Sequence, residues 1–407
     1  MQLKLAVVAT VYFTAVINDN FYRQVALLLV VAGGMAHLQG YATCLFMLPF
    51  ILFAAHAGFL ADRFSKRSVI IAAKALALLA FVFGAVGLYW LNWPIIMAAL
   101  FILGLQAALF SPAINGTIPE LCPSDYVVTA NGIIQMVATV AILLGIAGAG
   151  FVLDIKGVVS DIPFGRFFAV LFVIAASLVT LLTCFAMPRF PAASPRVSFP
   201  WRGPWESVVT LFNTRRDPLL AVSICSKAFF WFAGSLQILI VNPLGLTQFG
   251  LTKTLTSVLI VVELVGIAVG SLLAPFFARG VRWYRVLVPA SFVMAASMFA
   301  VAIVPFVSVF ARATVLVGAL AVLGLAGGVF SVPLTSFVQT RPATDLKGRM
   351  IASSNLADFL GILLSGVVFC LLDYIRISPS NCFAIEGVIV TAGAGWLLFV
   401  LARGKMQ

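Results

Sequence analysis

The chain has 407 residues, of which 63% are hydrophobic and only 9% are charged, and its formal net charge is +12. A soluble domain carries about a quarter charged residues, so this composition excludes an ordinary soluble protein. The mean hydropathy of +1.15 agrees with that exclusion. The basic residues lie in short loops between apolar runs rather than on one polar face, which argues against a nucleic-acid partner.

Apolar runs of about 20 residues or more recur along the whole chain, and each is long enough to cross a bilayer as a helix. We therefore predict an all-α membrane protein with twelve transmembrane helices in two six-helix halves. The predicted spans are 4–32, 40–61, 68–90, 94–115, 128–153, 164–187, 217–243, 253–278, 284–306, 312–338, 347–372 and 382–402. No small-residue cleavage site accompanies the first run, so we expect a membrane helix there rather than a removed signal peptide.

The longest polar break, Pro188 to Asp217, is rich in proline and arginine. It divides the chain into a predicted N-terminal half (1–187), a linker (188–216) and a C-terminal half (217–407). If the N-terminus is cytoplasmic, seventeen Lys and Arg residues lie on the cytoplasmic side and five on the other. The positive-inside rule then predicts a cytoplasmic linker and cytoplasmic termini.

A sequence repeat relates the two halves. The segment 103–112 in the fourth span matches 323–333 in the tenth, and Asn131-Gly132 corresponds to Ser354-Asn355. A period of about 220 residues is typical of a transporter built from two parallel repeats. The loop Gly58–Arg67, with its Asp62-Arg63 pair and its later basic pair, resembles the signature loop of the major facilitator superfamily. The alternative is an ordinary positive-inside loop.

Three further stretches resemble the bacterial lysophospholipid transporter family: Asn18–Phe21, Phe110–Ala113 and Val332–Leu334. This resemblance implies import of lysophospholipid across the bacterial inner membrane, with membrane lipid as the substrate and an acyltransferase as a partner enzyme. The spans and loops account for all 407 residues, so we expect that enzyme to be a separate protein. One departure is that Ile114–Gly116 replaces the Lys-Tyr-Gly run of the family, which removes a base that could meet a phosphate.

Helices one and four of each half line the cavity in that superfamily. The candidate substrate-binding residues are the polar side chains on the corresponding spans: Asn18, Asp19, Arg23, Gln106, Asn115, Lys227 and Gln237. Asp19 and Arg23 share a helix face, so either they neutralise each other or Asp19 binds a cation and Arg23 a phosphate. Lys227 either faces Asp19 or an anionic headgroup, or it snorkels to the interface. The amides could instead only join helices.

A second set of residues is predicted to couple or gate transport: Asp62, Arg63, Arg67, Glu120, Glu263, Asn355 and Asp358. Glu263 lies mid-span with no base nearby in sequence. An unpaired carboxyl there favours its neutral form, which makes Glu263, and similarly Asp358, a candidate proton site. We expect Glu120 to form a charge contact between the halves, and Lys74 to snorkel from the third span.

The chain shows no Ser/His/Asp grouping, no nucleotide-binding loop and no metal-ligand spacing. We therefore expect no enzyme activity, no catalytic residue, no cofactor and no metal. Cys370 and Cys382 flank one short loop, which leaves a disulfide between them open.

The sequence predicts a secondary transporter that works by alternating access and moves lysophospholipid. The alternative is a proton-driven exporter of a small amphiphile, such as a drug or siderophore. A third hypothesis, a membrane subunit that does not transport, is disfavoured by the charges inside the spans.

Overall fold

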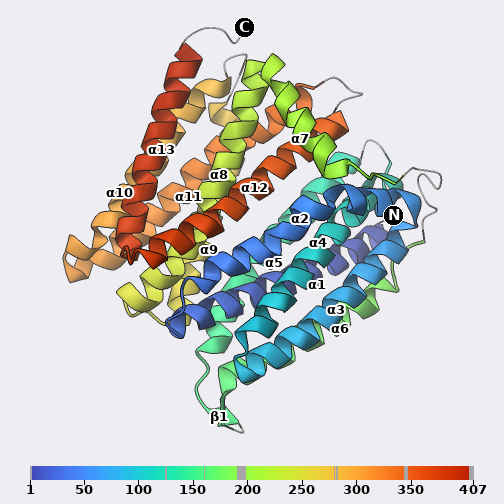
Figure 1. The fold of residues 1–407 in the computed structure, drawn as a ribbon, viewed down its shortest axis with the longest axis horizontal. Coiled ribbons are helices and arrows are strands. Elements are labelled where there is room, and N and C mark those ends of the chain that lie inside the picture. The colour runs from blue at the N-terminus through green and yellow to red at the C-terminus, as the bar shows by residue number, and fades with distance from the viewer. Residues whose placement is uncertain are drawn as a thin grey trace. The chain divides into compact units, whose positions relative to one another are not determined.

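The computed structural model describes residues 2–123, 126–159, 161–189, 199–278, 280, 283–342 and 347–402 (Figure 1). Within these ranges, 12 helices are long and apolar enough to cross a membrane, and every predicted span falls on one of them. The prediction of an all-α protein with twelve spans is therefore confirmed.

The spanning helices are α1 (Gln2–Ala32), α2 (Leu38–Arg63), α3 (Lys66–Trp90), α4 (Trp93–Leu121), α5 (Val127–Leu153), α6 (Phe164–Cys184), α8 (Pro218–Pro243), α9 (Lys253–Phe277), α10 (Leu287–Ile303), α11 (Val309–Thr340), α12 (Lys347–Tyr374) and α13 (Pro379–Ala402). The shorter elements are β1 (Val158–Val159), β2 (Ile162–Pro163), α7 (Gly203–Asn213), η1 (Thr214–Arg216), η2 (Leu244–Gln248), η3 (Trp283–Val286) and η4 (Val304–Phe306). The predicted linker lies partly outside the described residues, and its described part contains α7.

The chain divides into two compact units. Unit 1 comprises Met1–Gly34, Tyr41–Pro204 and Thr252–Ser257, and unit 2 comprises Met35–Gly40, Trp205–Leu251 and Val258–Gln407. Unit 1 therefore holds α1 to α6 except the start of α2, together with the first turn of α9. Unit 2 holds the rest of α9 and the other helices from α7 onward.

Unit 1 is built on close contacts between its helices. Helix α1 packs against α5 and α6, and α3 packs against α4 and α6. A β-carbon at Gly145 of α5 would lie 2.7 Å from the carbonyl oxygen of Ile17 on α1, so this approach requires glycine. Small residues permit such contacts in membranes, where van der Waals packing rather than hydrophobic burial drives helix association.

Unit 2 follows the same packing rule. Helix α8 packs against α11 and α12, and α10 packs against α11 and α13. Gly324 of α11 lies directly against the main chain of Glu263 on α9, where any side chain would collide. The sequence repeat falls on α4 of unit 1 and α11 of unit 2, and each of these helices carries an internal proline, Pro112 and Pro333.

All six cysteines lie within the described residues, and no disulfide joins any of them. The disulfide between Cys370 and Cys382 that the sequence left open is therefore not formed. The thiol of Cys370 instead lies 3.3 Å from the carbonyl oxygen of His37, and that of Cys382 lies 3.8 Å from the carbonyl oxygen of Ile377. Both residues act as small side chains with a weak donor.

Asp154, directly after α5, caps the first turn of α9 within unit 1. Its Oδ2 accepts hydrogen bonds of 2.7 Å from both the main-chain N–H and the hydroxyl of Thr254, and Lys253 Nζ lies 3.8 Å from Oδ1. Burial alone would raise the pKa of the Asp154 carboxyl. The hydrogen bonds from Thr254 and Lys253 and the charge of Lys253 together lower the pKa by more than burial raises it, so the net pKa lies below its ordinary value.

We predict that Asp154→Asn destabilises the protein at neutral pH by about 0.3–1 kcal/mol, because the amide still accepts a hydrogen bond but the negative charge at the start of α9 is lost. A lowered folded-state pKa gives stability that is fully present above the unfolded pKa and is lost as the pH falls through the folded pKa. The difference between wild type and variant should therefore shrink in acid. Thermal unfolding of the purified protein over a pH series measures this difference.

The matched control is Asp161→Asn, because Asp161 is exposed beside the β1–β2 turn. A deficit in Asp154→Asn that is the same at every pH would contradict the charged cap.

Candidate functional site

A chain of polar side chains links three helices inside unit 1. Lys74 Nζ on α3 donates a hydrogen bond of 2.9 Å to Gln106 Oε1 on α4, and Gln106 Nε2 donates one of 3.2 Å to Asp19 Oδ2 on α1. Lys74 Nζ also lies 3.7 Å from the centre of the Phe110 ring. Lys74 and Gln106 are buried. The Gln106 amide therefore bridges the Lys74 ammonium and the Asp19 carboxylate, which do not contact each other directly.

The expectation that Lys74 snorkels to the interface is wrong. The amine stays inside the bundle because an amide, a carboxylate and an aromatic face together replace the water that it would otherwise need. Its direct partner Gln106 is 32 residues away in sequence, so local spacing gave no sign of this contact. Asp19 and Gln106 were predicted from the sequence as site residues, whereas Lys74 was not.

Arg23 and Asp19 do not form the ion pair that their spacing allows. The Arg23 guanidinium lies 5.4 Å from the centre of the Phe46 ring on α2. The ion pairs in the described part of the chain do not include Arg23. Asp19 accepts its bond from Gln106, and among the described residues its Oδ1 has no hydrogen-bond partner. Arg23 therefore keeps a planar set of N–H donors that pair with no acidic residue in the described ranges.

Two further amides predicted to bind substrate have different surroundings. Asn18 is buried, and its Nδ2 donates a hydrogen bond of 3.0 Å to the carbonyl oxygen of Val173 on α6. Asn115 is exposed, and its Nδ2 lies 3.5 Å from Ser111 Oγ on the same helix. Asn18 therefore joins two helices, whereas Asn115 makes only a local contact.

The buried ion pair of unit 2 joins α8 to α12. Lys227 Nζ lies 2.5 Å from Asp358 Oδ2 and 3.2 Å from Ser354 Oγ, and all three side chains are buried. Lys227 was predicted to bind substrate and Asp358 to gate transport, and the structure brings the two side chains together. Lys227 does not snorkel. Asn355, next to Ser354, is exposed.

A second polar group in unit 2 consists of Gln237 on α8, Glu386 on α13 and Glu263 on α9. Gln237 Nε2 donates a hydrogen bond of 2.9 Å to Glu386 Oε1. Both glutamates are buried, and Oε2 of each has no hydrogen-bond partner among the described residues. Glu386 was not predicted as a site residue, although a lone acid inside the last apolar run is a visible signal.

The loop between α2 and α3, with the residues around it, is bound within unit 1. Lys66 forms an ion pair with Glu120 near the end of α4, and Arg67 Nη2 donates a hydrogen bond of 2.6 Å to a main-chain carbonyl just beyond α6. Glu120 therefore pairs with Lys66 of its own unit, a contact that was not predicted from the sequence. Asp62 and Arg63 are exposed.

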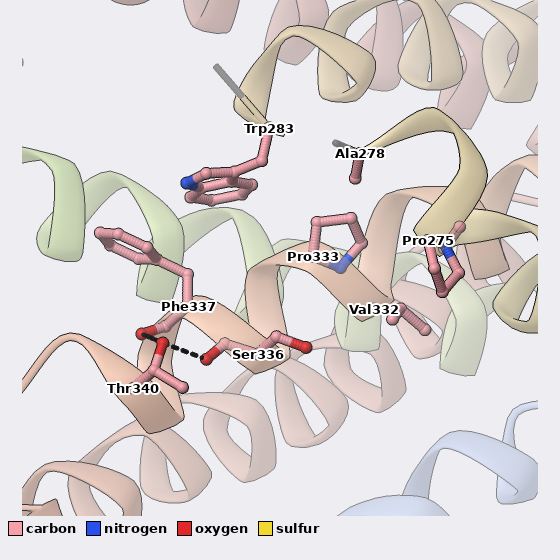
Figure 2. A pocket seen from close by; sticks show the side chains of 9 residues that line it. Pro275, Ala278, Trp283, Val332, Pro333, Ser336, Phe337 and Thr340 are labelled. Atoms are coloured by element: carbon pink, nitrogen blue, oxygen red, sulfur yellow. Dashed lines mark hydrogen bonds between the residues drawn. The ribbon is translucent and has the colours of Figure 1, made fainter. Parts of the chain in front are cut away.

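A pocket of about 300 Å³ lies at the ends of α9 and α11 in unit 2 (Figure 2). Figure 2 shows the rings of Trp283 and Phe337 beside one another, and their centres are 4.8 Å apart. Pro275 and Pro333 line the same pocket, and none of its 9 lining residues is charged. The pocket therefore offers an apolar surface, separate from the charged groups above.

Comparisons with known proteins agree on one family. Residues 8–366 match the sequence family that is described as the Major Facilitator Superfamily. The chain is 30% identical over 332 residues to the lysophospholipid transporter LplT of Serratia proteamaculans (strain 568), covering 78% of this chain and 75% of that protein. It is 30% identical over 373 residues to LplT of Enterobacter sp. (strain 638), covering 88% and 83%.

Solved structures with the same fold include a D-xylose-proton symporter, with a TM-score of 0.75, 16% identity and coverage of 97% of each chain. A bacterial homolog of the human lysosomal transporter Spinster gives a TM-score of 0.71 at 15% identity, covering 98% of this chain and 96% of that chain. At these identities the structures establish the fold alone.

We predict that Lys227→Met and Asp358→Asn each destabilise the protein by about 3–5 kcal/mol, because each leaves one buried charge without its partner. The double variant Lys227→Met/Asp358→Leu leaves neither charge and should be more stable than either single variant. Thermal unfolding in detergent gives the ranking, and Lys156→Met, at an exposed lysine after α5, controls for the loss of a positive charge. If the double variant is no more stable than the less stable of the two single variants, the result would contradict the interpretation that the two charges compensate each other.

Proposed function

Because the chain belongs to the major facilitator superfamily, we propose that this secondary transporter moves lysophospholipid across the bacterial inner membrane by alternating access. The observation that carries this proposal is the 30% identity to LplT proteins over most of both chains. The stretches Asn18–Phe21 and Phe110–Ala113, which suggested the family from sequence, lie on α1 and α4 beside the polar chain of unit 1.

Arg23 is the residue we assign to the phosphate of the lysophospholipid. A guanidinium binds phosphate through two parallel N–H···O bonds, which is the strongest recognition a side chain offers to this group. The assignment is supported by the ion pairs in the described part of the chain, because none of them joins an acidic residue to Arg23. Lys227 is less suited to the role, because Asp358 already neutralises it.

Asp19 is the residue we assign to a cationic headgroup amine. Its Oδ2 is held by Gln106, while Oδ1 has no hydrogen-bond partner among the described residues. Asp19 and Arg23 are one helical turn apart on α1, so a zwitterionic headgroup would meet an acid and a base on the same helix face.

We propose that both termini and the linker at 188–216 are cytoplasmic, with the halves at 1–187 and 217–407. The excess of seventeen over five basic residues supports this orientation. Lysophospholipid delivered to that side would be consumed by an acyltransferase, which is the partner enzyme that this function requires. Asp62, Arg63, Arg67, Asn355 and the Lys66–Glu120 pair remain proposed gating residues.

A second candidate function is proton-driven export of a small amphiphile. The observation that favours it is the pair Glu263 and Glu386, two buried carboxyl groups that form no ion pair among the described residues. Export of this kind should collapse when an uncoupler dissipates the proton gradient.

We predict that proteoliposomes containing the purified protein take up labelled lysophosphatidylethanolamine, and that Arg23→Ala lowers the uptake rate by about tenfold or more, the cost of a lost charge-assisted hydrogen bond. Asp19→Asn should lower uptake of the zwitterionic lipid more than uptake of lysophosphatidylglycerol, whose headgroup has no amine. Asp161→Asn, outside the proposed site, should match the wild type.

Uptake by protein-free liposomes equal to uptake by the wild type would overturn the lipid assignment. Equal loss for the two lipids in Asp19→Asn would overturn the role given to that carboxylate.

A further inference from the structure

Glu263 and Glu386 are two acidic side chains inside unit 2 that form no ion pair with any base among the described residues. Glu263 is 3% exposed and Glu386 is 1% exposed, and the ion pairs in the described part of the chain include neither residue. An ionisable group among membrane helices needs a partner or a function. In each residue Oε2 lacks any hydrogen-bond partner among the described residues.

The two carboxyl groups are close enough to interact electrostatically, but their surroundings differ. Gln237 Nε2 donates a hydrogen bond of 2.9 Å to Glu386 Oε1, and a donated bond stabilises an ionised carboxylate. Glu263 receives no such bond from the described residues. Of the two, Glu386 is the better place for a negative charge and Glu263 the better place for a proton.

The helices packed around the pair supply no free positive charge within the described residues. Helix α10 has no charged residue, and the Lys227 of α8 is held by Asp358. Arg312 of α11 donates its N–H groups to main-chain carbonyls, and Lys253 at the start of α9 forms its ion pair in unit 1. The thiol of Cys382 on α13 is the other titratable group that interacts with Glu386.

A metal ion is not the ligand that this arrangement favours. Hard cations such as Ca²⁺ and Mg²⁺ need six or so oxygen ligands. The described part of the chain contains no group of three His, Cys, Asp or Glu side chains that could hold a metal ion. Two nearby carboxyl groups cannot both ionise at low cost, and one proton removes the repulsion between them.

We propose that Glu263 and Glu386 form a proton-binding site of unit 2, in which Glu263 carries the proton and Gln237 holds Glu386 as the ionised partner. The proton comes from water and forms an O–H bond on a Glu263 carboxyl oxygen. Its release leaves both groups negative in an apolar bundle, so release requires a change in their surroundings. The further step, that such a change accompanies substrate movement, rests on the proposed transporter function.

Infrared spectroscopy of the purified protein in lipid nanodiscs tests the site without any substrate. Protonated carboxyl groups absorb apart from ionised ones, so a pH titration reports how many protons the buried acids hold. We expect Glu263→Gln to remove the absorbance of one protonated carboxyl at neutral pH. Glu386→Gln should keep that absorbance but let Glu263 deprotonate at a lower pH, because its neighbour is no longer negative.

Glu206→Gln is the matched control: Glu206 is exposed on α7, so its replacement should leave the absorbance of protonated carboxyl groups at neutral pH unchanged. Circular dichroism checks that each isosteric variant keeps its helices. A spectrum at neutral pH that is the same in wild type and in Glu263→Gln/Glu386→Gln would overturn the proposal, as would a titration that shifts with Na⁺ at constant ionic strength. Failed lipid uptake together with the expected spectra would overturn the proposed substrate and leave the proton site intact.

Discussion

A charge buried among apolar helices has to be compensated by the side chains around it, and this constraint explains where the polar residues of the chain lie. In unit 2 the compensation is direct, with 2.5 Å between Lys227 Nζ and Asp358 Oδ2. In unit 1 it passes from Lys74 through Gln106 to Asp19. Each set of contacts joins two or three helices, so the bonds that neutralise the charges also hold those helices in place.

The buried lysines that have partners within their unit hold helices together, and the charged residues that lack an ion-pair partner are the ones left to bind ligands. Lys74 and Lys227 already have partners, which removes these two buried lysines from consideration as phosphate ligands. Within the part of the chain that the structure describes, Arg23 lies over an aromatic ring without an acidic partner, and Glu263 and Glu386 pair with no base. A proposed anion site in unit 1 and a proposed proton site in unit 2 follow from these exceptions. The apolar pocket beside Trp283 contributes to neither site.

The spans and the repeat could be predicted from sequence because the bilayer imposes a local requirement, a run of about 20 apolar residues. The partners of the charged residues could not. Lys227 and Asp358 are 131 residues apart, and only the packing of α8 on α12 brings them together. The one pairing suggested by spacing, Asp19 with Arg23, fails because Gln106 and Phe46 approach α1 from other helices. Glu386 was overlooked for a different reason, because a lone acid inside the last apolar run is visible in the sequence itself.

Whether Asp19 and Lys74 act together through Gln106 can be measured by a double-mutant cycle on the free energy of unfolding, with Asp19→Asn, Lys74→Met and the combined variant. Compensation within unit 1 predicts that the double variant is less destabilised than the sum of the single variants, with a coupling of about 1–2 kcal/mol. Additive effects, within about 0.5 kcal/mol, would show that the two charges do not compensate each other and would contradict the constraint from which both proposed sites follow.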